Sequence, residues 1–282
     1  GLDVTLIGRV PTPVLYHTVF TKGVDGGVMI TGSHNPPDHN GFKICLGTST
    51  LYGSQIQEIK QIALSGEFSD GEGTLENLDV LENYCSDIIS RVSFGGRALK
   101  AVVDGGNGMG GVTAVPVYEH LGVELIQLFV EPDSTFPNHH PDPTVIENLQ
   151  DTIRSVRESG ADLGIAFDGD GDRIGVVDEN GRIIWGDELM VLLSRSILAE
   201  NPGATIIAEV KCSQNLFDDI AQHGGRPIMW KAGHSLIKAK MKETGAALAG
   251  EMSGHIFFAD RFYGFDDAAY AGARLLEILS KT

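Results

Sequence analysis

Three aspartates alternate with glycines in one short run of this chain, where Asp168, Asp170 and Asp172 are followed by Arg173. Apolar stretches typical of buried strands flank this run on both sides. Carboxylates held this close together at a tight turn repel one another unless a cation lies between them. Because oxygen ligands of this kind favour a hard divalent cation, the spacing predicts a metal loop. An acidic hairpin tip is the simpler alternative.

A calcium-binding EF-hand loop is a second alternative for this run, because Glu179 falls at its twelfth position. An EF-hand loop turns on a glycine at its sixth position, where this chain has Arg173. Its flanks are also helices rather than strands. The sequence therefore favours magnesium over calcium.

A second candidate site is Ser33, which follows a short predicted strand and is followed by His34 and, farther on, Lys43. Pro36 and Pro37 are expected to stiffen this loop. Such a serine could be a nucleophile, although the same residue types are also common in ordinary turns. The chain has no G-x-S-x-G elbow around this serine, which argues against a Ser-His-Asp hydrolase.

A third candidate site is the segment Gly250–His255, in which polar side chains alternate after a predicted strand. Alternation would point Glu251, Ser253 and His255 to one side, which suits hydrogen bonding to sugar hydroxyls. An ordinary polar loop at a strand end is the alternative. Cationic side chains near the carboxyl ends of parallel strands are further candidates for binding phosphate. These are Arg173, Lys211, His234, Lys238 and Arg261.

The glycine run from Gly106 to Gly111 matches G-x-G-x-x-G after a predicted strand, with Glu131 at a suitable distance for dinucleotide binding. A helix-packing loop explains this weak motif equally well. His139 and His140 lie between two prolines. No further ligand lies at a useful spacing, so a rigid loop is expected there rather than a metal site.

Composition limits the classes of partner. The chain has 282 residues with 21 Lys and Arg against 38 Asp and Glu, a formal net charge of −17. Such a surface repels nucleic acid and anionic lipid, so we expect neither nucleic acid nor a membrane as a partner. Three widely separated cysteines fit a reducing compartment. No apolar stretch is long enough to cross a bilayer, and no signal peptide is apparent, so a cytoplasmic location is expected.

The alternation of apolar patterns predicts consecutive α/β domains, with mixed or parallel sheets and helices on both faces. The expected domains are residues 1–80 with the serine loop, 81–182 with the metal loop and 183–282 with the sugar loop. Helices are expected at residues 49–68, 81–92, 112–122, 148–160, 187–200, 213–224, 234–245 and 266–280. Strands are expected at residues 27–31, 42–46, 98–104, 123–130, 163–167, 174–178, 205–210, 226–231 and 247–252.

Together the motifs resemble a known family. TGSHNPPDHNGFK, FDGDGDR and GEMSGH occur in the order of the phosphoserine, metal and sugar-binding loops of the α-D-phosphohexomutase superfamily. The likeness extends to NHHPDP, MWKAGHS and RFYGFDD. It is strongest to the bifunctional phosphomannomutase/phosphoglucomutase branch. Phosphoglucosamine mutases are the alternative branch, but they usually carry Gln at the position of Met252.

The resemblance implies reversible transfer of a phosphoryl group between the 1 and 6 positions of glucose or mannose phosphate. The implied cofactors are Mg²⁺ and a glucose or mannose 1,6-bisphosphate, which serves as intermediate and activator. The implied partners are small-molecule hexose phosphates, and the implied oligomeric state is a monomer.

The resemblance also assigns roles to individual residues. Ser33 is the implied phosphoserine, and its phosphate shares the Mg²⁺ with Asp168, Asp170 and Asp172. The implied ligands of the sugar hydroxyls are Glu251, Ser253 and His255. The implied groups that transfer or position protons are Lys43, His34 and His234, and those that help to hold the phosphates are Arg173 and Lys211.

The chain departs from the family pattern in extent. Members of the family have four domains, and a clamp for the non-reacting phosphate lies in the fourth. Neither that clamp nor the N-terminal part of domain 1, with its active-site arginine, is found here, so we expect a piece of a mutase. An alternative of another class is a catalytically silent fragment that binds metal and phosphosugar. A Ca²⁺-binding structural module is a third hypothesis.

Overall fold

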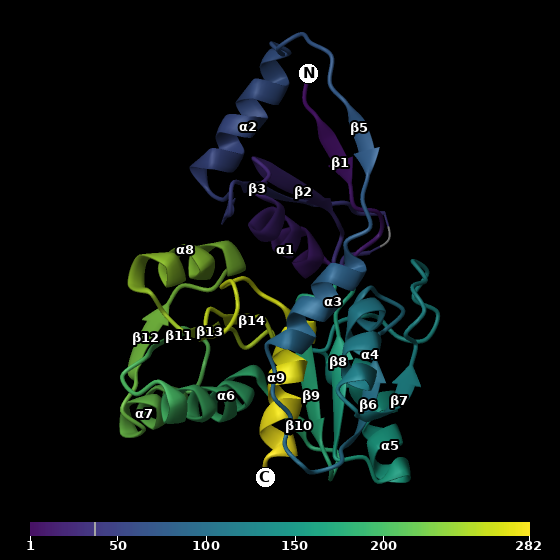
Figure 1. Ribbon diagram of the computed structural model, residues 1–282, viewed down its shortest axis with the longest axis vertical. Coiled ribbons are helices and arrows are strands. Elements are labelled where there is room, and N and C mark those ends of the chain that lie inside the picture. Colours follow the sequence, from purple (N-terminus) through teal and green to yellow (C-terminus); the bar gives the residue numbers. More distant parts are fainter. Residues whose placement is uncertain (37) are drawn as a thin grey trace.

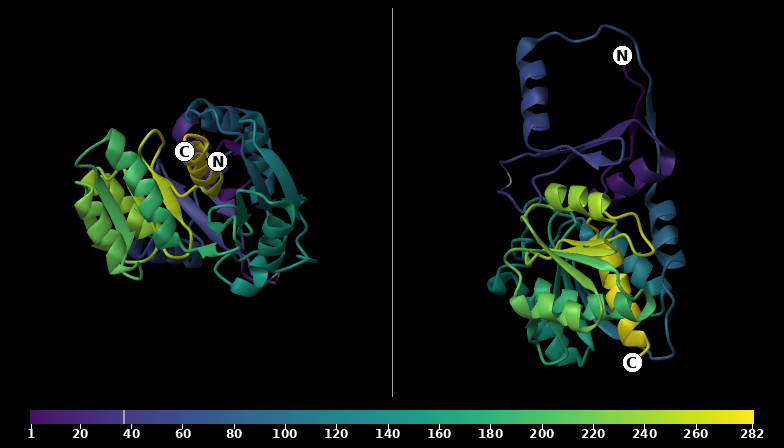
Figure 2. Two further views of the ribbon diagram at one scale, coloured as in Figure 1. Left: turned by 90° about the horizontal axis from the view of Figure 1, so that it is seen from below. Right: turned by 90° about the vertical axis from the view of Figure 1, so that its left-hand side faces the viewer.

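The computed structural model describes residues 1–36 and 38–282. Within them the strands form four sheets, with helices packed around the larger two. Figure 1 shows the N-terminal part of the chain above two larger parts that lie side by side. The second view in Figure 2 shows the outer end of the N-terminal part projecting away from the rest of the chain, whereas its inner end lies against the two larger parts.

The N-terminal part holds two small sheets. Strands β1 and β5 pair in parallel, whereas β2, β3 and β4 form an antiparallel sheet. Helix α2 buries none of its residues, and the outer face of the antiparallel sheet exposes Ile30 and Phe42. The elements are β1 (Val4–Leu6), α1 (Thr12–Lys22), β2 (Gly26–Ile30), β3 (Phe42–Leu46), β4 (Ser49–Thr50), α2 (Ser54–Ser65) and β5 (Leu75–Asn77).

Helix α1 is the main element that the sequence patterns missed. It is buried nearly all round, so it lacks the polar face that marks a surface helix. Its boundaries do carry signals, because Pro13 lies in its first turn and Gly23 ends it with φ 65°. This helix brings Thr12 and Tyr16 to the region where all three parts meet.

The middle part is built on a five-stranded sheet of order β10-β9-β8-β6-β7. Strands β6, β7 and β8 are parallel, whereas β9 and β10 run antiparallel to their neighbours. The mixed sheet confirms the predicted α/β class. The elements are α3 (Leu81–Ser90), β6 (Lys100–Asp104), α4 (Gly110–His120), β7 (Glu124–Leu128), a 3-10 turn (Ile146–Leu149), α5 (Gln150–Ser159), β8 (Leu163–Phe167), β9 (Ile174–Asp178) and β10 (Ile183–Ile184).

The C-terminal part has a four-stranded sheet of order β12-β11-β13-β14. Strand β14, which was not predicted, pairs antiparallel with β13. Helix α9 leaves this part and packs against α4 and β9 of the middle part (Figure 1, yellow). The elements are α6 (Gly186–Glu200), β11 (Thr205–Glu209), α7 (Gln214–Gln222), β12 (Arg226–Trp230), α8 (His234–Thr244), β13 (Leu248–Gly250), β14 (Ile256–Phe258) and α9 (Ala268–Ser280).

No helix in the described ranges is both long enough and apolar enough to span a bilayer.

Asp267 joins α9 to α3 in the buried centre of the molecule. Its carboxylate caps α9 by accepting a hydrogen bond from the Tyr270 backbone N–H at 2.9 Å. The Tyr84 hydroxyl of α3 donates to the same carboxylate at 2.8 and 2.9 Å. Burial, reinforced by the neighbouring Asp266, raises the pKa of Asp267 to about 7. The folded protein therefore holds a proton here that the unfolded chain releases near pH 4.

This raised pKa sets the sign of a pH effect on stability. The folded state binds more protons between pH 4 and 7, so the contribution of Asp267 is full at low pH and is lost as the pH rises through about 7. From pH 5 to pH 8, the free energy of unfolding should fall by about 3 kcal/mol more in the wild type than in Asp267→Asn. Urea unfolding of both proteins at each pH measures this difference, and parallel pH dependences would contradict it.

Candidate active site

The metal loop lies between β8 and β9, which pair antiparallel up to Phe167 and Ile174. Asp168, Asp170 and Asp172 are all buried, and one ligand atom from each lies within 4.8 Å of the others. The backbone N–H groups of Asp172 and Arg173 donate to Asp168 Oδ1 at 3.0 and 3.1 Å. The backbone of the turn thus fixes the Asp168 carboxylate beside the other two predicted ligands.

The donor set of this loop fits a hard divalent cation. Among the described residues, Asp170 Oδ1 and Asp172 Oδ1 are buried and have no hydrogen-bond partner. Unpartnered carboxylate oxygens in a buried turn are costly, and such oxygens are the ligands that Mg²⁺ and Ca²⁺ prefer. The flanking β8 and β9 are strands, which contradicts the helix-loop-helix of an EF-hand.

Lys43 reaches the loop from β3. Its Nζ donates to Asp170 Oδ2 at 2.6 Å and to Asp172 Oδ2 at 2.5 Å. Burial disfavours the ammonium, but the Asp172 and Asp170 carboxylates outweigh burial and raise the pKa of Lys43. Proton abstraction by Lys43 needs a shift in the opposite direction. Lys43 is therefore suited to neutralising charge.

The three carboxylates differ in their environments. Burial, together with the charges of Asp172 and Asp170, raises the pKa of Asp168. Burial also acts against ionised Asp170, but Lys43 outweighs it and lowers the pKa of Asp170. The Thr12 hydroxyl at the start of α1 donates to Asp170 Oδ2 at 2.6 Å.

Ser33 lies directly against the metal loop. Its Oγ donates to Asp168 Oδ2 at 2.8 Å, and His34 Nδ1 lies 3.0 Å from the same Oγ. Ser33 has a left-handed backbone with φ 50°, which is uncommon for a residue with a side chain and points to a constrained loop. Burial lowers the pKa of His34. Pro37, one of the two prolines expected to stiffen the loop, lies outside the described residues.

Glycines allow the close contact between the serine loop and the metal loop. A Cβ on Gly169 would lie 2.1 Å from the Ser33 carbonyl oxygen, and a Cβ on Gly108 would lie 2.8 Å from Gly169 Cα. The Met109 N–H donates to the Gly169 carbonyl at 2.9 Å. This geometry accounts for the glycine run as a packing loop and removes the structural argument for dinucleotide binding.

The sugar loop meets the metal loop from the other side. Arg173 and His255 form an isolated β-bridge, and Arg173 Nε donates to His255 Nε2 at 3.0 Å. Glu251 is buried and accepts a hydrogen bond from the Gly233 N–H at 2.5 Å, and burial raises its pKa. Ser253 lies between them and is half-buried.

His234 and Lys211, two further predicted residues, have different surroundings. His234 begins α8 and stacks on His255 with ring centroids 5.6 Å apart. Burial lowers the pKa of His234 to about 4, so its imidazole is neutral at pH 7. Lys211 is exposed, and its Nζ lies 3.2 Å from Glu209 Oε1, the oxygen that also accepts a hydrogen bond from the Met252 N–H of the sugar loop at 2.8 Å.

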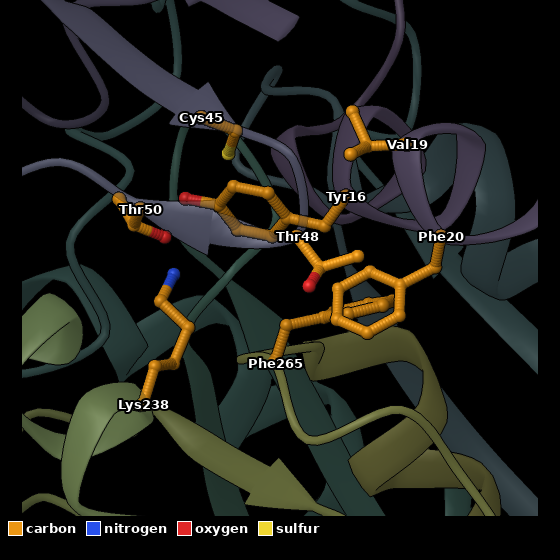
Figure 3. A pocket seen from close by; sticks show the side chains of 8 residues that line it. All are labelled: Tyr16, Val19, Phe20, Cys45, Thr48, Thr50, Lys238 and Phe265. Carbon is orange, nitrogen blue, oxygen red and sulfur yellow. The ribbon is translucent and has the colours of Figure 1, made fainter. Parts of the chain in front are cut away.

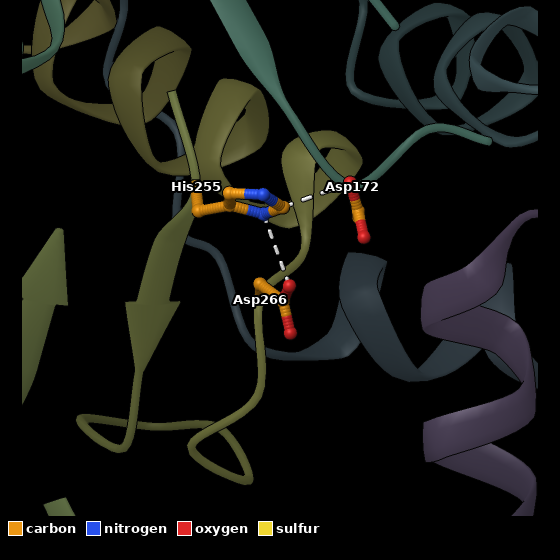
Figure 4. Close-up of side chains that lie close together, drawn as sticks. All are labelled: Asp172, His255 and Asp266. Carbon is orange, nitrogen blue, oxygen red and sulfur yellow. Dashed lines mark ion pairs between the residues drawn. The ribbon is translucent and has the colours of Figure 1, made fainter. Parts of the chain in front are cut away.

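Sequence reasoning assigned no role to Asp266, which the structure places among the site residues. Its side chain lies between His255 and Lys238 and is fully buried. Figure 4 shows Asp172, His255 and Asp266 converging on one point, where one ligand atom of each lies within 4.8 Å of the others. Arg173 and Lys238 already donate to this group, which marks it as a hydrogen-bonded cluster rather than a second metal site.

Comparison with known proteins agrees with this geometry. Models of the phosphoglucomutase/phosphomannomutase family match alpha/beta/alpha domain I at residues 1–70, domain II at residues 82–181 and domain III at residues 185–282. The chain belongs to this family. The family assignment made from the three motifs is thereby confirmed.

Individual relatives cover the chain from end to end. Phosphomannomutase/phosphoglucomutase of Pseudomonas aeruginosa is 52% identical over 281 residues, which make up 100% of this chain and 60% of that protein. Phosphoglucomutase of Neisseria meningitidis is 49% identical, covering 99% of this chain and 61% of that protein. A crystal structure of a family protein from Burkholderia thailandensis superposes with a TM-score of 0.95 at 50% identity, covering 99% of this chain and 63% of that one. The chain spans about three fifths of the length of the curated relatives it matches.

The contact between Gly169 and Ser33 generates a test of the geometry. Gly169→Ala places a Cβ against the Ser33 carbonyl, so the serine loop must shift, and overpacking of this kind costs about 1–3 kcal/mol. We expect a lower free energy of unfolding and faster amide exchange in residues 31–36. Gly96→Ala is the control, because a Cβ there meets no atom within 4 Å. Equal exchange in both variants would contradict the close contact.

Proposed function

We propose that the protein carrying this chain transfers a phosphoryl group reversibly between the 1 and 6 positions of a hexose phosphate, with Ser33 as the carrier. The observation that carries the proposal is the hydrogen bond from Ser33 Oγ to Asp168 Oδ2, at 2.8 Å, inside the three-aspartate loop. The Arg173–His255 contact joins the predicted sugar loop to that same loop. The proposed phosphoryl carrier, the proposed cation site and the proposed sugar-binding segment are thus joined by one set of contacts, which supports the proposal.

The reaction proceeds in two transfers. The O–P bond of phospho-Ser33 breaks as an O–P bond forms to the free hydroxyl of a hexose monophosphate, which gives a hexose 1,6-bisphosphate. The bisphosphate then reverses its orientation and returns its other phosphoryl group to Ser33. Such transfers depend on in-line positioning and on neutralisation of charge more than on covalent assistance. Glucose and mannose phosphates are the proposed substrates, and their 1,6-bisphosphates the proposed activators.

Mg²⁺ is the proposed metal, held by Asp168, Asp170 and Asp172 together with the phosphate on Ser33. When bound, such an ion neutralises negative charge on the transferring phosphoryl group. Lys43 would add a second positive charge close to the same carboxylates. Arg173 and Lys211 are proposed to hold substrate phosphate.

Protons must leave the attacking sugar hydroxyl and return to the leaving serine oxygen. His34 lies 3.0 Å from Ser33 Oγ, and burial lowers its pKa, so its neutral ring can exchange a proton with that oxygen. His234 is neutral at pH 7 for the same reason. We propose that these two rings transfer or position protons, and that Glu251, Ser253 and His255 hold the sugar hydroxyls.

A second candidate function belongs to the 282-residue chain taken alone. Because the chain spans about three fifths of its curated relatives, it could bind metal and phosphosugar without turnover. Phosphoglucosamine transfer remains the alternative chemistry. We further propose that the protein is a cytoplasmic monomer. The proposed domain limits are residues 1–80, 81–182 and 183–282.

Ser33→Ala is expected to abolish phosphoryl transfer, because Ser33 Oγ is the one hydroxyl, within the part of the chain that the structure describes, that donates to Asp168. The measurement is a coupled assay of hexose 1-phosphate conversion, with phosphopeptide mapping of residue 33. Ser54→Ala, at an exposed position on α2, is the control and should retain both activity and phosphate. Near wild-type transfer by Ser33→Ala would refute the proposal, whereas a phosphorylated but inactive wild-type chain would favour the silent fragment.

Asp170→Asn removes one negative charge from the metal loop and should weaken Mg²⁺ binding at least about tenfold. Isothermal titration calorimetry measures the affinity. The rise in melting temperature that Mg²⁺ produces in the wild type should shrink in parallel. Asp25→Asn, an exposed carboxylate, is the control. Unchanged Mg²⁺ affinity in Asp170→Asn would show that the metal does not bind at this loop.

A further inference from the structure

Asp266 is a fully buried carboxylate in the loop between β14 and α9. Its two oxygens have different neighbours. Lys238 Nζ, from α8, donates to Oδ1 at 2.9 Å, whereas His255 Nδ1 lies 3.0 Å from Oδ2. His234 Nδ1 lies farther from Oδ2, at 3.8 Å. The carboxylate is therefore shared between one ammonium group and one imidazole that belongs to the predicted sugar loop (Figure 4).

Lys238 is held in place from a second direction. Its Nζ lies 4.0 Å above the centre of the Tyr16 ring, which comes from α1 in the N-terminal part. Figure 3 shows Lys238 pointing toward Tyr16 in the pocket that both residues line with Cys45 and Phe265. An ammonium group has only donors, so the oxygen of residue 266 that faces Lys238 must be an acceptor.

The contacts of His255 fix which nitrogen carries its proton. Arg173 Nε donates to His255 Nε2 at 3.0 Å, and a guanidinium has no acceptor, so Nε2 presents its lone pair. Nδ1 then carries the proton and faces Asp266 Oδ2. Asp172 Oδ1 lies 3.6 Å from the same nitrogen, beyond hydrogen-bonding distance. Asp266 is thus the one carboxylate, among the described residues, within hydrogen-bonding distance of Nδ1.

We propose that Asp266 is a positioning residue that keeps the proton on His255 Nδ1, so that Nε2 keeps its lone pair for Arg173 and the sugar loop stays joined to the metal loop. This role rests on the proposed phosphoryl transfer. In Ser-His-Asp triads a buried aspartate sets the tautomer of the catalytic histidine in the same way. Here Lys238 and Tyr16 extend the arrangement, because they fix the carboxylate from the side opposite His255.

Because Lys238 faces one oxygen of residue 266, Asp266→Asn should change the tautomer of His255. The new amide has one acceptor and one donor end, and Lys238 accepts no hydrogen bond. The amide oxygen must face Lys238, so the NH₂ group faces His255 Nδ1. That donor favours the lone pair on Nδ1 and moves the ring proton to Nε2. His255 Nε2 then presents a donor to Arg173 Nε, which is also a donor, so the contact between the sugar loop and the metal loop is lost.

The test combines ring nitrogen NMR with the transfer assay. In ¹⁵N-histidine-labelled wild type, the His255 signals, identified by their loss in His255→Gln, should show a protonated Nδ1. In Asp266→Asn the proton should appear on Nε2, and the transfer rate should fall about 100-fold or more. Asp266→Asn/Lys238→Met frees the amide to turn its oxygen toward His255. This double variant should return the proton to Nδ1 and recover part of the rate.

Asp267→Asn is the matched control, because residue 267 is the next carboxylate along the chain and is equally buried. An asparagine there can still cap α9 and accept from Tyr84. We expect an unchanged His255 tautomer and a rate close to that of the wild type.

Two results would overturn the inference. One is an unprotonated Nδ1 on His255 in the wild type. This measurement does not depend on the folding of any variant. The other is Asp266→Asn with the proton still on Nδ1 and a rate within about threefold of the wild type. If no transfer is detected in any of the proteins, the proposed function fails. The NMR measurement still tests the role of Asp266 in setting the His255 tautomer, because it does not depend on transfer activity.

Discussion

Three carboxylates buried in one turn repel one another, and much of the surrounding structure is arranged to offset that repulsion. Lys43 arrives from β3 of the N-terminal part, and Arg173 follows the turn directly. Backbone N–H groups within the turn supply further positive ends of dipoles to Asp168. A cation bound by the remaining oxygens would complete this neutralisation. The contacts that balance the charge are also the contacts that bring the parts of the chain together.

The same compensation operates on a larger scale. The chain carries a net charge of −17, yet its substrates, on the proposed function, are anions. The positive groups needed to bind them are concentrated where Lys43, Arg173 and Lys238 face buried carboxylates. Burial strengthens each of these pairs relative to pairs on the surface, where solvent and salt screen the charges. Local pairing thus keeps positive groups together at the candidate site in a protein whose overall charge repels anions.

How far the sequence predicts this structure depends on the kind of signal. The metal loop follows from residue spacing alone, because alternating aspartates between two apolar strands leave few other arrangements. Ser33 required the resemblance, since its local residues are also those of a turn. Helix α1 was missed because a helix buried nearly all round has no polar stripe. Asp266 was missed because its importance comes from partners far along the chain, Lys238 and His255, which only the tertiary fold places beside it.

Gly108, Gly169 and the Ser33 carbonyl are stacked so closely that backbone meets backbone where the serine loop lies against the metal loop. A contact made by backbone atoms has no side-chain rotamer that could change if one of the two loops moved. A reaction that presents both ends of one sugar to one oxygen must be accommodated somewhere. On the proposed function, Ser33 is held in place by this backbone contact, so the change of orientation between the two transfers falls to the sugar bisphosphate and not to the serine.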